Sequence, residues 1–304
     1  MKFLVALPDS NYFLWQMLVQ INNFRKWGYE KDTIYVIGKN KHQISNTLMN
    51  IMDGDIKSEF HIINDTRKNP QYSSSLRPHI LAKLFDSNPE MEKETFFYID
   101  PDVIFTKKMK INDLEKNDIW YLSDTRSYID SKYIKGKSDK LFLEMCNIVG
   151  IKPEIVEKND NNAGGAQYLM KNLTKEYWEK VEKDSENLFK HMVETSNKYN
   201  PKHPIQSWTS DMWAVLWNAW LFGHETKLSK RINFSWATDL TKKWNDNSIY
   251  HNAGAVSGDK TFFVKTEHQI SPFNKKLKAD KKYCSFNYIK EIKNTEKNFE
   301  NILF

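Results

Sequence analysis

Residues 96–105 read FFYIDPDVIF, an apolar run that Asp100 and Asp102 interrupt before it resumes. Residues 96–99 predict a buried strand, so the two carboxylates stand at its carboxyl end, where open α/β sheets bind ligands. Hard oxygen ligands at that position suit Mg²⁺ or Mn²⁺ carrying a diphosphate. Asp-Pro-Asp is also a good turn sequence. The stretch therefore predicts an α/β fold and leaves a metal site and a plain turn as alternatives.

Outward from this stretch, the first half of the chain alternates strands and helices. Apolar runs predict strands at 3–7, 33–37, 59–63, 96–99 and 119–122, and helical spacing predicts helices at 12–27, 43–52 and 78–85. Gly28 and Gly38 close the elements before them. Successive βαβ units predict a Rossmann-like, mostly parallel sheet with helices on both faces.

The second half is less regular. We expect a polar loop at 158–162, an apolar segment at 166–170 and a long helix at 173–194. The Pro- and Asn-containing insertion at 196–204 is interpreted as a mobile lid. Trp213, Trp217 and Trp220 are spaced by four and three, which predicts one buried helix face. The Lys-rich residues after 275 predict a solvated terminal helix and tail.

The bulk composition is that of an ordinary folded domain. The chain has 304 residues, 40% hydrophobic and 14% aromatic, which argues against disorder. Its apolar stretches are too short or too interrupted to span a bilayer, so we expect no membrane partner. Two cysteines, abundant Lys and scarce Arg suggest the cytoplasm of a bacterial or phage-infected cell with an AT-rich coding genome. The net charge of +6 permits an anionic partner without requiring one.

Four segments in fixed order add a family resemblance: SLRPHILAKLF at 75–85, YIDPD at 98–102, NNAGGAQ at 161–167 and IYHNAG at 249–254. Together they resemble a nucleotide-sugar glycosyltransferase of the GT-A type. The first two look most like the hydroxyproline O-arabinosyltransferase and peptidyl-serine galactosyltransferase group. The last two are similar to the glycogenin-like retaining transferases. The order of the motifs is more specific than any one of them.

The resemblance covers roughly residues 2–255 and implies a GT-A fold with an irregular acceptor-side half. It divides the chain into a nucleotide-sugar-binding half at 1–125, an acceptor-binding and catalytic half at 126–260, and a basic C-terminal extension at 261–304.

The resemblance also implies a role for individual residues. Asp100, Asp102 and His251 would bind Mn²⁺ or Mg²⁺, and Asp211 would be the catalytic carboxylate. The nucleotide would contact Ala6, Leu7, Pro8, Asp65, Arg77 and Lys83. The donor sugar would contact Asn162, Gly164, Gly165 and Gln167. Apart from the resemblance, Trp236 and Trp244 are aromatic side chains that could receive an acceptor base that has left the DNA stack. The glycogenin-like pattern expects a lysine soon after Gly254. Residues 257–260 read SGDK instead, so Lys260 departs from that pattern as a diphosphate contact.

Ordinary structural roles compete with several of these assignments. Arg77 would instead be a surface residue or pair with an acid, and Ser210 or Asp211 would cap the following helix. Gly164 and Gly165 after an asparagine also suit a turn.

The resemblance favours a metal-dependent, retaining transfer of a pentose or hexose from a UDP-sugar to an acceptor hydroxyl. 5-Hydroxymethylcytosine in phage DNA is one candidate acceptor, and a bacterial glycan or protein hydroxyl is another. A Mg²⁺-dependent phosphoryl or nucleotidyl transferase is the rival enzyme, because paired aspartates serve those reactions too. No G-x-x-x-x-G-K-[ST] motif accompanies them, and Ile104 stands where the phosphatase pattern needs Thr or Val. A non-catalytic nucleic-acid-binding protein is the third alternative.

Overall fold

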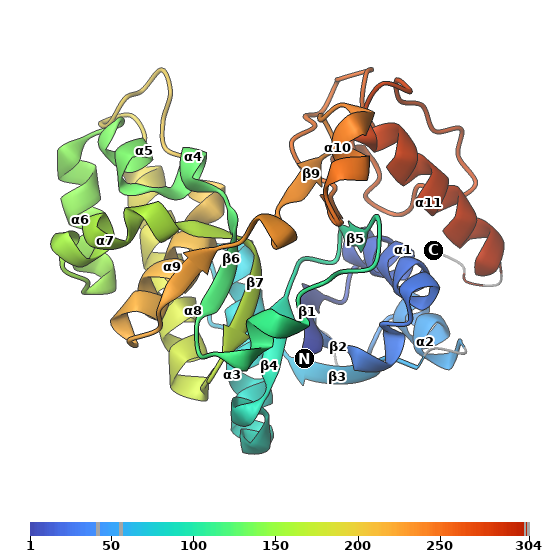
Figure 1. Cartoon of the computed structure of the whole chain (residues 1–304), viewed down its shortest axis with the longest axis horizontal. Coiled ribbons are helices and arrows are strands. Elements are labelled where there is room, and N and C mark those ends of the chain that lie inside the picture. Colours follow the sequence, from blue (N-terminus) through green and yellow to red (C-terminus); the bar gives the residue numbers. More distant parts are fainter. Residues whose placement is uncertain (41–42, 55–56, 301, 303–304) are drawn as a thin grey trace. The chain divides into compact units, whose positions relative to one another are not determined.

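The computed structural model describes residues 1–40, 43–54, 57–300 and 302. These residues form two compact units: the first holds Met1 with residues 63–98 and 112–230, and the second holds 2–62, 99–111 and 231–304. Strands and covering helices occur in each unit (Figure 1), which confirms the α/β class. The division at residues 125/126 and 260/261 stays a prediction, and residues 41–42, 55–56, 301 and 303–304 of those segments lie outside the described residues.

The first unit contains part of the central sheet and a group of helices. Its strands lie in the order β4-β7-β6-β8, with β7 antiparallel to both neighbours and β8 parallel to β6. The strands are β4 (Thr95–Tyr98), β6 (Trp120–Asp124), β7 (Gly164–Lys171) and β8 (Thr226–Leu228). The helices are α3 (Leu76–Ser87), α4 (Arg126–Ile129), α5 (Ser131–Lys135), α6 (Asp139–Val149), α7 (Pro153–Asn159), α8 (Lys175–Glu194) and α9 (Ser210–Leu221). Helix α9 packs against α8 and β7 (Figure 1).

The second unit contains strands in the order β3-β2-β1, with β1 and β2 parallel, and a small sheet in the order β5-β10-β9. The strands are β1 (Lys2–Pro8), β2 (Thr33–Lys39), β3 (Glu59–Asn64), β5 (Val103–Phe105), β9 (Phe234–Trp236) and β10 (Ile249–His251). The helices are α1 (Asn11–Trp27), α2 (Asn46–Asp53), α10 (Thr241–Asp246) and α11 (Cys284–Asn298). The strand and helix positions predicted for the first half of the chain are confirmed, with bounds shifted by a few residues.

Local sequence explains how these elements begin and end. The strand β1 is buried along most of its length, as its continuous apolar run predicts. Helix α1 ends at Gly28, whose φ of 75° lies in the left-handed region that glycine adopts without a Cβ clash. The Gly28 N–H donates to the Arg25 carbonyl and so satisfies a terminal acceptor of the helix.

Two expectations for the second half need correction. Residues 158–162 are not a polar loop, because they contain the end of α7 and a 3-10 turn at Asp160–Asn162. Pro153 sits in the first turn of α7, where its missing N–H costs no hydrogen bond, and the polar run continues as a turn closed by Ala163 N–H to Asp160 O. The apolar segment at 166–170 forms the middle of β7.

The terminal helix is also less solvated than expected. One face of α11 buries Cys284, Tyr288 and Ile292 in a cluster that includes Trp15 and Val19 of α1. Spacing by four residues places the three α11 side chains on one helical stripe, so the Lys-rich composition describes the other face alone. By contrast, the predicted burial of Trp213, Trp217 and Trp220 on α9 is confirmed.

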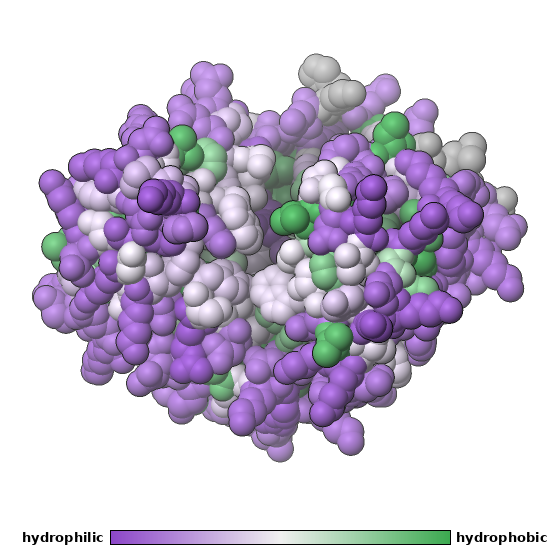
Figure 2. Space-filling model, turned by 90° about the horizontal axis from the view of Figure 1, so that it is seen from above, coloured by the Kyte–Doolittle hydropathy of each residue, from purple (hydrophilic) through white to green (hydrophobic). Residues whose placement is uncertain are grey.

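The surface is mainly hydrophilic, and its hydrophobic residues form small separate groups in the view of Figure 2. Among the described residues, no helix combines the length and apolarity that crossing a bilayer requires.

Candidate metal centre and carboxylate cluster

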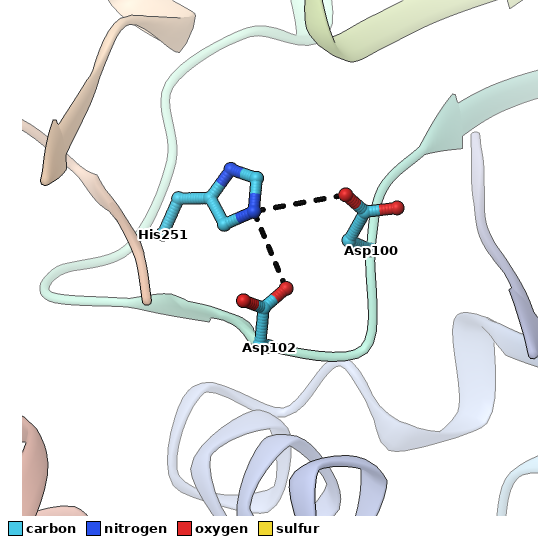
Figure 3. A group of neighbouring side chains, drawn as sticks. All are labelled: Asp100, Asp102 and His251. Atoms are coloured by element: carbon cyan, nitrogen blue, oxygen red, sulfur yellow. Dashed lines mark ion pairs between the residues drawn. The ribbon is translucent and has the colours of Figure 1, made fainter. Parts of the chain in front are cut away.

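Three predicted metal ligands meet in the second unit. Asp100 follows β4, Asp102 precedes β5, and His251 ends β10, whose antiparallel register pairs His251 with Val103. The His251 Nε2 atom lies 3.3 Å from Asp102 Oδ1 and 3.6 Å from Asp100 Oδ2, with the three side chains pointing toward one another (Figure 3). One potential ligand atom from each residue lies within 4.8 Å of the others. Octahedral Mg²⁺ with bonds of about 2.1 Å places its ligand atoms roughly 3 to 4 Å apart, so the cluster fits a divalent ion.

The loop carrying the aspartates is held by buried polar groups. Val103 N–H donates to Asp100 O over 3.2 Å, so Asp-Pro-Asp also forms the tight turn that the sequence allowed. The Gln20 side-chain amide donates to Asp100 O at 2.9 Å and to Val103 O at 2.7 Å. The Asn252 N–H donates to Asp102 O over 3.1 Å. The turn and the metal cluster are therefore compatible, because the turn fixes the backbone while the carboxylates remain directed at His251.

Lys265 contacts the same carboxylate. Its Nζ lies 2.5 Å from Asp102 Oδ2, and the Asp102 side chain is only 3% exposed. Burial by itself raises the pKa of the Asp102 carboxyl, but the Lys265 ammonium and then His251 outweigh burial and hold that pKa well below its usual range. Burial works to lower the pKa of Lys265, and Asp102 reverses this and raises it. The pair is therefore charged at neutral pH.

The predicted acceptor-binding tryptophans have different surroundings. The Trp236 ring lies parallel to the His251 ring, with an 8° interplanar angle and centroids 6.2 Å apart. Gly254, with φ of 90°, approaches Trp236 so closely that a Cβ there would lie 3.4 Å from the ring. Trp244 packs against the α1–α11 core and contacts Tyr250. Their acceptor roles stay predictions.

A second polar cluster lies in the first unit around Asp211. Arg77 forms an ion pair with Asp211 Oδ2, and the Tyr72 hydroxyl donates to Asp211 Oδ1 over 2.6 Å. The alternative in which Ser210 or Asp211 caps α9 is wrong, because Thr209 is the N-cap and no side chain caps the helix there. The alternative in which Arg77 pairs with an acid is confirmed by this ion pair. Asp211 nonetheless lies in the first turn of α9, where the helix dipole favours negative charge.

The predicted donor-sugar residues belong to β7 and the turn before it. Gly164 and Gly165 are strand residues rather than a turn: a Cβ on Gly164 would lie 2.4 Å from Ser123 O, and one on Gly165 would lie 2.6 Å from the Tyr168 hydroxyl. Close packing therefore accounts for both glycines. Gln167 is fully buried and accepts a hydrogen bond from the Ser123 hydroxyl, and Asn162 is the last residue of the 3-10 turn. Sugar contacts by these residues stay predictions.

The predicted nucleotide-binding residues are spread over both units. In the second unit, Ala6 and Leu7 are buried inside β1, and Pro8 at its end is half-buried. In the first unit, both Asp65 oxygens pair with Arg67, and Lys83 donates to Asn64 O and to the Thr66 hydroxyl. Nucleotide contacts by these residues stay predictions.

Sequence reasoning missed three residues of these clusters. Lys265 lies farther along the chain from Gly254 than Lys260 does, and the lysine that the glycogenin-like pattern expects after the glycine is the signal that points to this region. Tyr72 and Gln20 carry no motif, so no signal in a single sequence identifies them.

Comparison with family models and with curated proteins gave no match. Among solved structures, the chain is similar to WbbM, a bifunctional glycosyltransferase, with a TM-score of 0.51 and 11% identity over 99% of this chain and 51% of that one. The chain thus spans about half the length of WbbM. It is also similar to the galactosyltransferase LgtC, solved with donor and acceptor sugar analogs, with a TM-score of 0.48 and 10% identity over 100% of both chains. The fold is the GT-A glycosyltransferase fold, which confirms the predicted fold class.

Proposed function

We propose that the protein is a metal-dependent glycosyltransferase that moves a pentose or hexose from a UDP-sugar to an acceptor hydroxyl. The observation that carries this proposal is the cluster of Asp100, Asp102 and His251 in a chain with the GT-A fold. These three residues would hold Mn²⁺ or Mg²⁺. Such an ion stabilises the negative charge of a departing nucleoside diphosphate, the main electrostatic task in breaking an anomeric C–O bond.

Asp211 is the proposed catalytic carboxylate. In an inverting reaction it would accept the proton of the acceptor hydroxyl, and in a retaining reaction it would stabilise positive charge at the anomeric carbon. The resemblance to glycogenin-like transferases favours retention. Its contacts with Arg77 and Tyr72 support a fixed carboxylate orientation, which either role requires.

Two kinds of acceptor hydroxyl are proposed. A hydroxymethylated base in phage DNA would have to leave the base stack to reach a buried site. The net charge of +6 and the half-buried Trp236 beside His251 support that acceptor. A bacterial glycan or protein hydroxyl is the alternative, supported by the resemblance to arabinosyl- and galactosyltransferases. The two cysteines are buried and free, which supports a bacterial or phage-infected cytoplasm.

The first test is a thermal-shift screen of nucleoside diphosphates with and without Mn²⁺. A ligand present at 100 times its Kd stabilises the native state by about 2.7 kcal/mol, so UDP with Mn²⁺ should raise the melting temperature and either alone should raise it less. Asp100→Asn should lose the Mn²⁺-dependent part. Asp53→Asn, at an exposed position on α2, is the matched control and should keep it. A shift equal in the presence of EDTA would contradict the metal assignment.

The second test separates the acceptors and the rival functions. The protein is incubated with UDP-pentoses and UDP-hexoses and with 5-hydroxymethylcytosine DNA, unmodified DNA or a saccharide. Transfer to modified DNA, with binding that weakens steeply in salt, supports the DNA acceptor. Transfer to the saccharide alone excludes it. Release of phosphate or nucleotidyl products without sugar transfer would favour a Mg²⁺-dependent phosphoryl or nucleotidyl transferase, and DNA binding without any turnover would favour a binding protein.

A further inference from the structure

Asp102 has a nitrogen-bearing side chain next to each of its two oxygens. Lys265 Nζ lies 2.5 Å from Oδ2, and His251 Nε2 lies 3.3 Å from Oδ1. Asp102 is 3% exposed, whereas the Lys265 side chain is 26% exposed. The carboxylate is therefore withdrawn from water, and the lysine reaches it from the solvent side of the protein.

A buried carboxylate needs a compensating charge, because removing an ion from water is costly unless it is paired. Lys265 supplies that charge within the protein itself. A divalent ion held by Asp100, Asp102 and His251 would supply it as well. Two cations at one carboxylate repel each other strongly in a poorly solvated environment, so the presence of one weakens the binding of the other at Asp102.

We propose that Lys265 is an internal counter-ion that competes with the divalent metal for Asp102. This inference rests on the proposed function, since it takes the metal site as given. In the free protein the ammonium stabilises the Asp102 carboxylate and weakens metal binding. An anionic ligand that arrives with the metal offsets the repulsion between the two cations, so the metal and a nucleoside diphosphate bind with positive coupling.

The site thereby discriminates between a metal ion alone and a metal ion accompanied by a diphosphate. Lys265 follows the buried Val264 and begins a 3-10 turn, Lys265–Glu267. The backbone anchor of the lysine is therefore fixed, and release from Asp102 requires only rotation of its flexible side chain.

The test measures Mn²⁺ binding by calorimetry and by the electron paramagnetic resonance signal of free Mn²⁺. Lys265→Met should bind Mn²⁺ alone about ten-fold more tightly than the wild type, a typical size for a coupling between two sites. Lys265→Arg keeps the charge and should remain weak. The matched control Lys276→Met removes an exposed lysine of the same unit and should match the wild type. The Mn²⁺–UDP coupling should shrink in Lys265→Met alone. Unchanged or weaker Mn²⁺ binding in folded Lys265→Met would overturn the inference.

A second measurement needs no substitution and covers the case in which Lys265→Met does not fold. Acetylation of Lys265 in the wild type, followed by mass spectrometry, should accelerate when Mn²⁺ and UDP are added, because the metal releases the amine from Asp102. Acetylation of the exposed Lys276 should stay constant. Constant acetylation of Lys265 while Mn²⁺ binds would refute the competition and leave the proposed function intact. Failure of every variant and of the wild type to bind Mn²⁺ would refute both.

Discussion

The Tyr72 hydroxyl donates a 2.6 Å hydrogen bond to Oδ1 of Asp211, and both residues are buried. The pair joins residues 139 positions apart in the chain. Arg77 contacts the other oxygen of the same carboxylate. Asp211 is therefore oriented from two sides, which is how a carboxylate is kept in one rotamer.

The first prediction concerns this contact. Tyr72→Phe should destabilise the protein by about 1 to 3 kcal/mol, because it leaves a buried carboxylate oxygen without a donor. Urea unfolding measures the loss. Tyr177→Phe is the matched control, since the Tyr177 hydroxyl donates to the Val215 backbone carbonyl instead. Both variants should lose stability, and only Tyr72→Phe should also lower sugar transfer. Equal transfer rates in the two variants would separate Tyr72 from catalysis.

The second prediction compares the two aspartates of the metal cluster. Asp102→Asn should lower the free energy of unfolding by about 1 to 3 kcal/mol. This is less than the loss expected on breaking a fully buried ion pair, because water still reaches Lys265. Asp100, with 27% of its side chain exposed, should tolerate Asn with little loss. Chemical denaturation in EDTA measures both. A larger loss of unfolding free energy for Asp100→Asn than for Asp102→Asn would contradict a stabilising role for the Lys265–Asp102 ion pair.

The third prediction concerns pH and the thiols. Burial raises the pKa of Cys146 to about 12 and that of Cys284 to about 11. A buried thiol with a raised pKa favours the folded state as long as the thiol stays neutral in the unfolded chain. Its contribution to the free energy of unfolding is therefore complete below the unfolded thiol pKa of about 8.5 and is lost as the pH rises through the folded-state pKa values. Both thiols should resist a thiol reagent at pH 8 until denaturant is added. A variant with both Cys146→Ser and Cys284→Ser should lose less unfolding free energy than the wild type when the pH rises from about 8 to about 10.

The fourth prediction tests the tryptophan face of α9. Trp217 is fully buried and meets Phe142 edge-on, so Trp217→Ala should cost about 3 to 5 kcal/mol. Trp208 is 62% exposed, and Trp208→Ala should change stability by no more than about 0.5 kcal/mol. Thermal and urea unfolding of the two variants check the contrast, and similar losses would contradict the assigned burial.

The fifth prediction concerns residues 196–204, which are expected to act as a lid. Tyr199 within this segment is buried, and its hydroxyl donates to Glu144, so the segment is anchored at this residue. Hydrogen exchange with and without UDP-sugar and Mn²⁺ should show added protection at 196–204 and near Asn161. Unchanged protection in both segments would argue against a lid.

Much of this protein is determined by short-range sequence pattern. Strand and helix positions in the first half follow from apolar periodicity and from Gly28, because both signals are local to each element. Asp100 and Asp102 share one loop, so their proximity needs no fold. The polar composition of residues 158–162 predicts a loop, but the helix that begins at Pro153 extends into this run, and composition alone does not indicate where that helix ends.

The tertiary structure alone decided which distant residues complete each cluster. His251 reaches the aspartates because β10 pairs with β5, and Lys265 contacts Asp102 across 163 residues of chain. Tyr72 reaches Asp211 in the same way. Such pairings depend on strand register and helix packing, which are set by the whole core and leave no mark in the residues nearby.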